Sequence, residues 1–341
     1  MKSVRRFATA AFIIACLHLV FGAIVRISGS GMGCGDHWPK CYGSFFPPMN
    51  RPDLIVEVSH RYLASILLLA LIATFVAAWR RRSELFIGGR GGVLRMAGLA
   101  VALGFSAALL GAVTVKLGNA PFATLAHWTV AMSLVAATVA TLIRAGGLGG
   151  VRARIGGVSE KTKRGALAGA SMALLTVVMG GLTAKYPGAA VACRDFPLCG
   201  RNPDVVAGAV HVQLTHRVLA VLVVLHLIGL ASGIYRRGEA SIAKRAVTVA
   251  VILGLAQLGV AAAMVLGNLP PVLRSLHEAT GVSIWIATFT LAYLSRIASG
   301  GSAVALTGEI DPLVGETRGH GASRGHGPRV TSLGSPRGVE S

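Results

Sequence analysis

Charged residues are scarce in this 341-residue chain, at 13% against the roughly 25% that is usual in a soluble domain. Acidic residues number only 13, and five cysteines are too few for a disulfide-dense secreted scaffold. Hydrophobic residues make up 53% of the chain, and the mean hydropathy is +0.66. This composition excludes a soluble nucleic-acid-binding protein, a disordered protein and a collagen-like fibre. No nucleic-acid partner is expected, in spite of a formal net charge of +20.

Apolar stretches of about 20 residues, the length that crosses a bilayer, recur eight times. The sequence therefore predicts an all-α integral membrane protein with eight transmembrane helices, over 7–27, 56–79, 94–116, 122–143, 165–186, 207–234, 245–267 and 275–297. Of the 33 Lys and Arg residues, 23 lie in the N-terminus, in alternate connections and in the C-terminal tail. By the positive-inside rule, both termini are predicted to be cytoplasmic.

The second four predicted helices repeat the first four. His60, near the start of the second helix, matches His216 near the start of the sixth, and His127 in the fourth matches His277 in the eighth. Four helices per unit is an even number, so both halves keep the same orientation in the membrane. Two four-helix bundles related by a pseudo-twofold axis along the membrane normal are expected.

This duplication divides the chain into four parts. They are an N-terminal bundle (1–146), a cytoplasmic linker (147–164), a C-terminal bundle (165–297) and a Gly-, Ser-, Arg- and His-rich cytoplasmic tail (298–341). The tail is predicted to be disordered because its composition cannot bury a core.

The four repeated histidines lie at one depth, within two turns of the outer ends of their helices. One histidine inside a membrane often only hydrogen-bonds a neighbouring carbonyl, but four at equivalent positions favour a functional site. Two imidazoles facing each other across a bundle can ligate a heme iron, whereas zinc needs three or four protein ligands. We therefore predict a heme in each bundle, held by His60 and His127 in the first and by His216 and His277 in the second.

Other polar residues inside the predicted spans have two interpretations. Arg61 and Arg217 adjoin predicted ligands, and each would either pair with heme propionates or extend to the membrane interface. His18 and His226 have no partner in the repeat, so we assign both to core packing.

The halves differ at one position that bears on chemistry. Glu57 stands three residues before His60, whereas the matching residue before His216 is Gln213. Residues three apart share a helix face, so Glu57 is expected in the same pocket as His60, where a carboxylate can exchange a proton and an amide cannot. The alternative is an acid that stabilises a helix N-terminus. The contrast with Gln213 favours a catalytic Glu57 in the N-terminal half.

Each half also carries a cysteine pair, in the loop after its first helix. Cys34 with Cys41, and Cys193 with Cys199, are close enough in sequence for a bridge within each loop. These loops face the outer compartment, which permits disulfides. A bridge would shape a lid over each heme pocket, and a redox role for the first pair is the weaker alternative.

The pattern as a whole resembles the heme A synthase family of bacteria and mitochondria. The resemblance spans all eight helices and rests on Gly22–Met32, Cys34…Trp38-Pro39…Cys41, Glu57-x-x-His60-Arg61, Leu117-Gly118-Asn119, His127, Cys193…Pro197…Cys199, His216-Arg217 and His277. Each motif is weak alone, but their order and their duplication make the set specific.

The resemblance implies an enzyme that oxidises the C8 methyl group of heme O to a formyl group, giving heme A for terminal oxidases. It implies a heme b cofactor on His216 and His277, and substrate heme on His60 and His127 with Glu57 as the catalytic acid. It also implies redox chemistry at Cys34 and Cys41. A heme O synthase and oxidase assembly factors are the partners it suggests. No mitochondrial transit segment precedes the first helix, so a bacterial plasma membrane is expected.

Two other functions are compatible with the residues alone. A di-heme b-type cytochrome that only transfers electrons would have the same histidine pairs. A transporter built from parallel repeats would use the histidines as a proton relay and would bind no heme.

Overall fold

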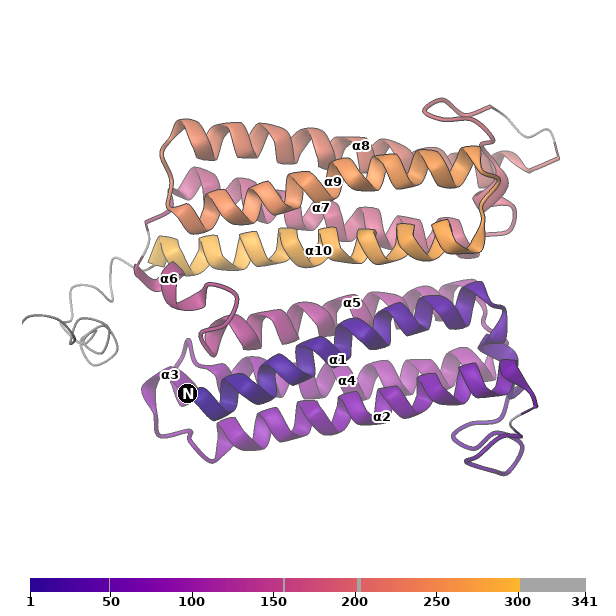
Figure 1. The fold of residues 1–341 in the computed structure, drawn as a ribbon, viewed down its shortest axis with the longest axis horizontal. Helices are drawn as coiled ribbons and strands as arrows, with labels where there is room; N and C mark the ends of the chain where they lie inside the picture. The colour runs from indigo at the N-terminus through magenta and orange to yellow at the C-terminus, as the bar shows by residue number, and fades with distance from the viewer. Residues whose placement is uncertain (49, 156, 201–203, 301–341) are drawn as a thin grey trace, which may run out of the picture.

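The computed structural model describes residues 1–48, 50–155, 157–200 and 204–300 (Figure 1). The described residues are helical and contain no strand, apart from one isolated bridge between Cys41 and Ser44. Beyond residue 300, the predicted tail lies outside the described residues. The α-helices are α1 (Lys2–Ile27), α2 (Pro52–Trp79), α3 (Leu85–Gly88), α4 (Val93–Lys116), α5 (Pro121–Arg144), α6 (Gly150–Ile155), α7 (Glu160–Lys185), α8 (Ala207–Arg236), α9 (Ser241–Leu266) and α10 (Pro271–Gly300).

Eight of the described helices are long and apolar enough to cross a membrane, so the chain is a multi-pass membrane protein. They correspond one for one to the predicted spans. The predicted spans end within three residues of the observed helix ends, but the helices begin up to five residues earlier. The first turns extend into polar sequence because a helix can continue past the hydrocarbon region, where hydropathy no longer marks it. The short helices α3 and α6 were not predicted, and α6 lies within the predicted linker.

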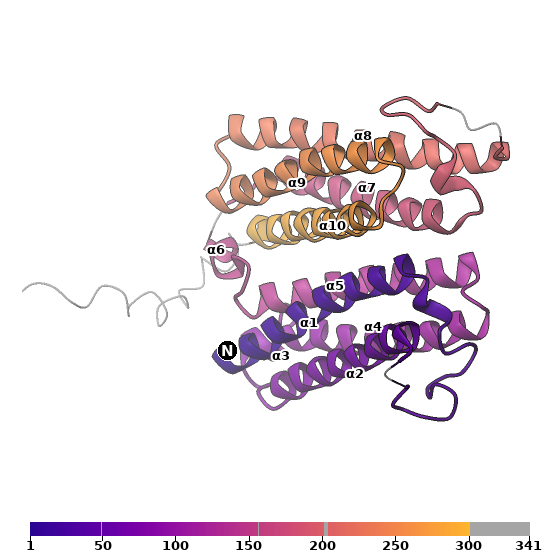
Figure 2. The same cartoon turned by 45° about the vertical axis from the view of Figure 1, so that its right-hand side comes forward.

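The eight long helices pack as two groups of four. Helices α1, α2, α4 and α5 contact one another in one group, and α7, α8, α9 and α10 form the other. Figures 1 and 2 show the two groups side by side, with α6 between them at one end. Contacts of α5 with α7 and of α1 with α10 join the groups. The Trp285 indole N–H donates to the Met132 carbonyl across this boundary (3.0 Å).

The helices that carry the predicted ligands begin with matching local structure. Pro121 and Pro271 stand at the first positions of α5 and α10, where a missing N–H costs nothing. Before them, Asn119 and Asn268 adopt φ angles of 59° and 60°, a left-handed conformation that asparagine tolerates. Asn119 also donates to the Gly31 carbonyl at 2.9 Å, which ties this turn to the loop after α1. The repeated Leu-Gly-Asn motif therefore fixes where α5 and α10, two of the four helices with predicted ligands, begin.

The two ends of the bundle pair differ in character. Met1 and the last turns of α10 lie at one end, and the cysteine loops lie at the other (Figure 1). At the first end, Glu239 is buried between α8 and α9, and accepts hydrogen bonds from Ser159 N (3.0 Å), Thr162 Oγ1 (2.7 Å) and Arg237 Nε (3.0 Å). Burial alone would raise the pKa of Glu239, but these bonds outweigh it and hold the pKa at about 2, below its usual 4.5.

Candidate functional site

The structure brings His216 and His277 together in the C-terminal group of helices. Their ring centres are 6.4 Å apart, with the ring planes at 77°. A metal–nitrogen bond of about 2 Å on each side, plus the distance from nitrogen to ring centre, gives a separation of roughly 6 Å. The two imidazoles are therefore spaced as axial ligands of one iron would be. Each side chain is half-buried.

A cavity of about 300 Å³ surrounds this histidine pair. Its wall is mainly apolar, and basic side chains line it as well: Arg26, Lys185, Arg217 and Arg274. Trp128 borders it from α5, and its indole N–H is buried without a hydrogen-bond partner among the described residues. An apolar cavity with paired imidazoles, several cations and an unsatisfied donor fits a planar, apolar, dianionic group such as heme.

Within the described parts of the chain, His, Cys, Asp and Glu side chains form no group of three suited to a bare metal ion.

In the N-terminal group, no hydrogen bond or ring contact among the described residues joins His60 to His127, and a third histidine lies beside His60. The ring of His18 stacks on the ring of His60 with centres 4.2 Å apart and planes 7° from parallel. The assignment of His18 to core packing was thus incomplete, because helix packing places it on a predicted ligand. His226 does pack as predicted, with Nε2 2.9 Å from the Gly165 carbonyl.

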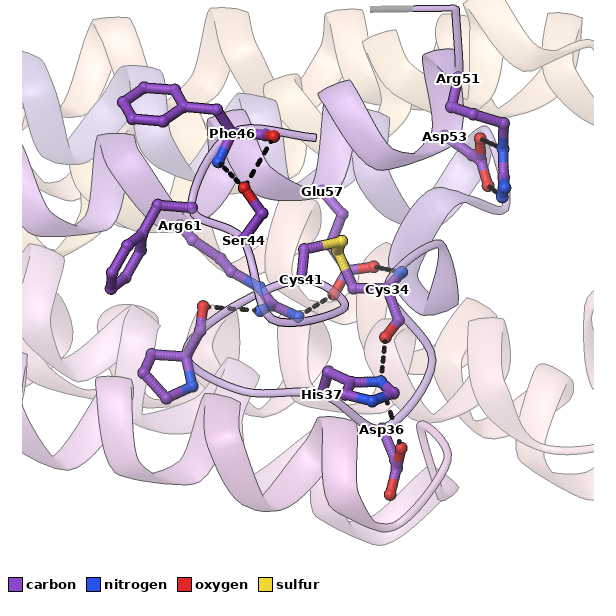
Figure 3. The surroundings of a disulfide bond; sticks show 12 residues. Cys34, Asp36, His37, Cys41, Ser44, Phe46, Arg51, Asp53, Glu57 and Arg61 are labelled. Atoms are coloured by element: carbon purple, nitrogen blue, oxygen red, sulfur yellow. Dashed lines mark hydrogen bonds and ion pairs between the residues drawn. A yellow bond between two sulfur atoms is a disulfide. The ribbon is translucent and has the colours of Figure 1, made fainter. Parts of the chain in front are cut away.

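Glu57 is buried near the start of α2 and faces the cysteine loop (Figure 3). Its carboxylate accepts a hydrogen bond from the Cys34 backbone N–H at 2.9 Å and pairs with the guanidinium of Arg61. Arg61 also donates to the Pro39 carbonyl at 3.0 Å. The carboxylate is thus held between α2 and the disulfide loop.

The second half repeats this arrangement with an amide. The Gln213 side-chain oxygen accepts a hydrogen bond from the Cys193 N–H at 2.8 Å, as Glu57 does from Cys34. Arg217 donates to the Asp195 carbonyl at 2.7 Å and to neighbouring loop carbonyls. Holding the loop therefore requires an acceptor but not a charge.

Both predicted disulfides are confirmed. Cys34 and Cys41 are bonded with Cα atoms 4.9 Å apart, and Cys193 and Cys199 with Cα atoms 4.5 Å apart. Each bridge closes a short loop whose first cysteine N–H reaches the Glu57 or Gln213 side chain. The disulfide loops therefore lie directly over the ends of the ligand-bearing helices.

Two contacts join the halves at the level of the sites. Arg26 of α1 pairs with Glu278 of α10, although the two are 252 residues apart in sequence, and both line the large cavity. On α5, His127 is followed by Trp128, which borders the cavity of the other half. Residues of α1 and α5, in the N-terminal group, thus complete the cavity of the C-terminal group.

Sequence reasoning missed Arg26, Lys185, Arg274 and Trp128 as cavity residues. Arg26 stands in a motif already singled out, so its position carried a signal. Lys185 and Arg274 became recognisable only when the helices of their own half were packed together, and Trp128 only when the two halves were, because hydropathy does not report helix neighbours.

The fold and these sites define a class of multi-pass membrane protein with paired histidines and a cysteine loop in each half. A family model described as cytochrome oxidase assembly protein (COX15-CtaA) matches residues 5–289, so the chain belongs to this family. A heme A synthase of Halalkalibacterium halodurans is 31% identical, over 67% of this chain and 74% of its own. A heme A synthase of Shouchella clausii is 27% identical, over 76% of this chain and 86% of its own.

Proposed function

We propose that this protein is an oxidoreductase that converts heme O to heme A, by oxidising the C8 methyl group to a formyl group. The relatives described as heme A synthases support this activity. Within this chain, the main support is that the two halves share one arrangement but have Glu57 in the first half where the second has Gln213. A protein that only transferred electrons would have no need for that difference.

The C-terminal bundle, 165–297, holds a resident heme b on His216 and His277. The 6.4 Å separation of their rings supports this assignment, as does the cation-lined cavity around them. When bound, this heme supplies one-electron redox chemistry beside the substrate half. Among the cavity cations, Lys185 and Arg274 are available to pair with its propionates, together with Arg217.

The N-terminal bundle, 1–146, holds the substrate on His60 and His127. Conversion of a methyl to a formyl group with oxygen taken from water is a four-electron oxidation that releases four protons (R–CH3 + H2O → R–CHO + 4 H+ + 4 e−), and its electrons leave to an external one-electron acceptor. Glu57 accepts these protons one at a time and passes them on, from a buried position where Arg61 balances its negative charge. The Cys34–Cys41 loop above Glu57 keeps bulk water from the reacting group.

The protein lies in a bacterial plasma membrane with both termini cytoplasmic and the disulfide loops outside. The excess of Lys and Arg at the end that carries Met1 supports this orientation. Its substrate comes from an enzyme that attaches a farnesyl group to heme, and its product goes to oxidase assembly factors.

The deciding experiment is extraction and chromatography of heme from protein purified from cells that make heme O. Heme B together with heme O or heme A is expected. Heme B alone, at two per chain, would instead identify a di-heme cytochrome. A folded protein without any heme would support a transporter.

The assignment of halves has its own test. The His216→Ala protein is expected to lose heme B but still take up heme O, and the His60→Ala protein is expected to do the reverse. Loss of the other heme in each case would reverse the halves.

A further inference from the structure

His60 is the exception among the four predicted ligands in how its ring is held. Nδ1 of His127 bonds the Ala107 carbonyl at 2.9 Å, and Nδ1 of His216 bonds the Thr176 carbonyl at 3.1 Å. Nδ1 of His277 faces the side-chain NH2 group of Gln257 at 3.1 Å, and it accepts a hydrogen bond from that group. A bond from Nδ1–H to a carbonyl, as in His127 and His216, orients the ring of a metal-binding histidine. Nδ1 of His60 is buried and has no such partner among the described residues.

The residue that occupies the anchoring position in the N-terminal half is His18. Gly22 packs against His60 as Gly180 packs against His216, with a Cβ on either glycine falling closest to the Cε1 atom of the ring. Thr176 lies four residues before Gly180, and His18 lies four residues before Gly22. In one half, therefore, the ring bonds the backbone at this position. In the other half it stacks on the side chain there, with centres 4.2 Å apart.

We propose that His18 is a positioning residue that makes heme binding at His60 exchangeable. Stacking on His18 holds the His60 ring away from the carbonyl that would orient it for ligation. Heme must displace this stack to bind, and the stack re-forms when heme leaves. A substrate site requires such exchange, whereas a resident cofactor benefits from the fixed ring of His216. This inference rests on the proposed assignment of halves.

The Nδ1 atoms of His18 and His60 are buried and have no hydrogen-bond partner in the described part of the chain, which supports this exchange. A buried polar atom without a hydrogen bond raises the free energy of the state that contains it. Rotation of the His60 ring onto the backbone carbonyl of residue 18 would satisfy one of them, as in the other half. The stacked arrangement is thus the heme-free state, and heme binding would release the His60 ring from the stack.

The test measures heme dissociation from the full-length protein carrying both hemes, by transfer to an excess of a heme-accepting apoprotein. Wild-type protein should release the two hemes in a fast phase from the N-terminal half and a slow phase from the C-terminal half. His18→Thr, which copies Thr176, should slow the fast phase about threefold to tenfold, the factor that an aromatic stack is worth. The slow phase should stay unchanged, and electron paramagnetic resonance should still report two low-spin hemes with two histidine ligands each.

The reciprocal variant Thr176→His should speed the slow phase, and it decides the question if His18→Thr does not fold. Cys16→Ala, on the same helix two residues from His18, is the matched control and should change neither phase. An unchanged fast phase in His18→Thr, or a change in both phases alike, would overturn the inference.

The His60→Ala protein separates failure of this inference from failure of the proposed function. If His60→Ala removes the fast phase while His18→Thr leaves it unchanged, only the role of His18 is wrong. If His60→Ala leaves the fast phase intact, the assignment of substrate heme to this half is wrong as well.

Discussion

Glu57 accepts a hydrogen bond of 2.9 Å from the backbone N–H of Cys34, which ties the proposed catalytic carboxylate to the first disulfide loop. The same bond exists in the second half between Gln213 and Cys193, at 2.8 Å. In the second half an amide therefore holds the corresponding loop, so a glutamine at position 57 is expected to keep the bond to Cys34 while it removes the charge that pairs with Arg61.

Glu57→Gln should fold, bind both hemes and lose activity. The amide keeps the bond to Cys34 but cannot accept a proton, so heme A formation should fall about a hundredfold or more. The measurement is the ratio of heme A to heme O in extracts, alongside heme content and thermal stability. Gln213→Glu is the matched control and should leave the ratio unchanged. Normal heme A formation by Glu57→Gln would remove Glu57 from the mechanism.

Gly180→Ala should expel the heme that we propose is bound by His216 and His277. A Cβ at this position would lie 2.9 Å from Cε1 of His216, so the ring must move from its present place. The extra methyl is expected to cost about 1–3 kcal/mol of stability. Heme content per protein, from absorbance of extracted heme, should fall by one. Gly259→Ala meets nothing within 4 Å and should keep both hemes, so equal heme content in the two variants would contradict the prediction.

Variants of the two cysteine pairs distinguish a structural role of the first disulfide from a redox role. Each bridge closes a loop of similar length, so loss of either should cost about 2.5 kcal/mol of stability by the chain-entropy model. If Cys34 and Cys41 also carry redox chemistry, changing both to Ser should reduce turnover far more than changing Cys193 and Cys199. Equal turnover in the two double variants, with equal loss of thermal stability, would leave only the structural role.

Stability in acid should depend on Glu239. Its pKa in the folded protein, about 2, lies below its usual 4.5, so the ionised carboxylate stabilises the fold above about pH 4.5. That contribution should disappear as the pH falls from 4.5 toward 2. The melting temperature in detergent should therefore fall over this pH range by more in the wild-type protein than in Glu239→Gln. Glu160→Gln is the control, because its exposed pair with Lys163 adds little. Parallel pH curves for wild type and Glu239→Gln would refute this.

The membrane spans were readable from the sequence because each depends on its own local composition. Lipid contact requires an apolar run of fixed length, whatever the neighbouring helix is. The beginning of α7 at Glu160 was missed by five residues because polar side chains are free to extend a helix beyond the lipid. The family and both disulfides were also predicted and are confirmed, because spacing along the chain carries them.

Composition and spacing along the chain specify the eight spans, the repeated positions of the predicted ligands and the contrast of Glu57 with Gln213. The contacts of each of these side chains follow from how the helices pack. The stack of His18 on His60, the pairing of Arg26 with Glu278 and the place of Trp128 beside the other half's cavity all arise where separate helices meet. Sequence periodicity identifies the helix face on which a residue lies. Which helix packs against that face depends on the packing of the whole bundle, and no local sequence pattern specifies it.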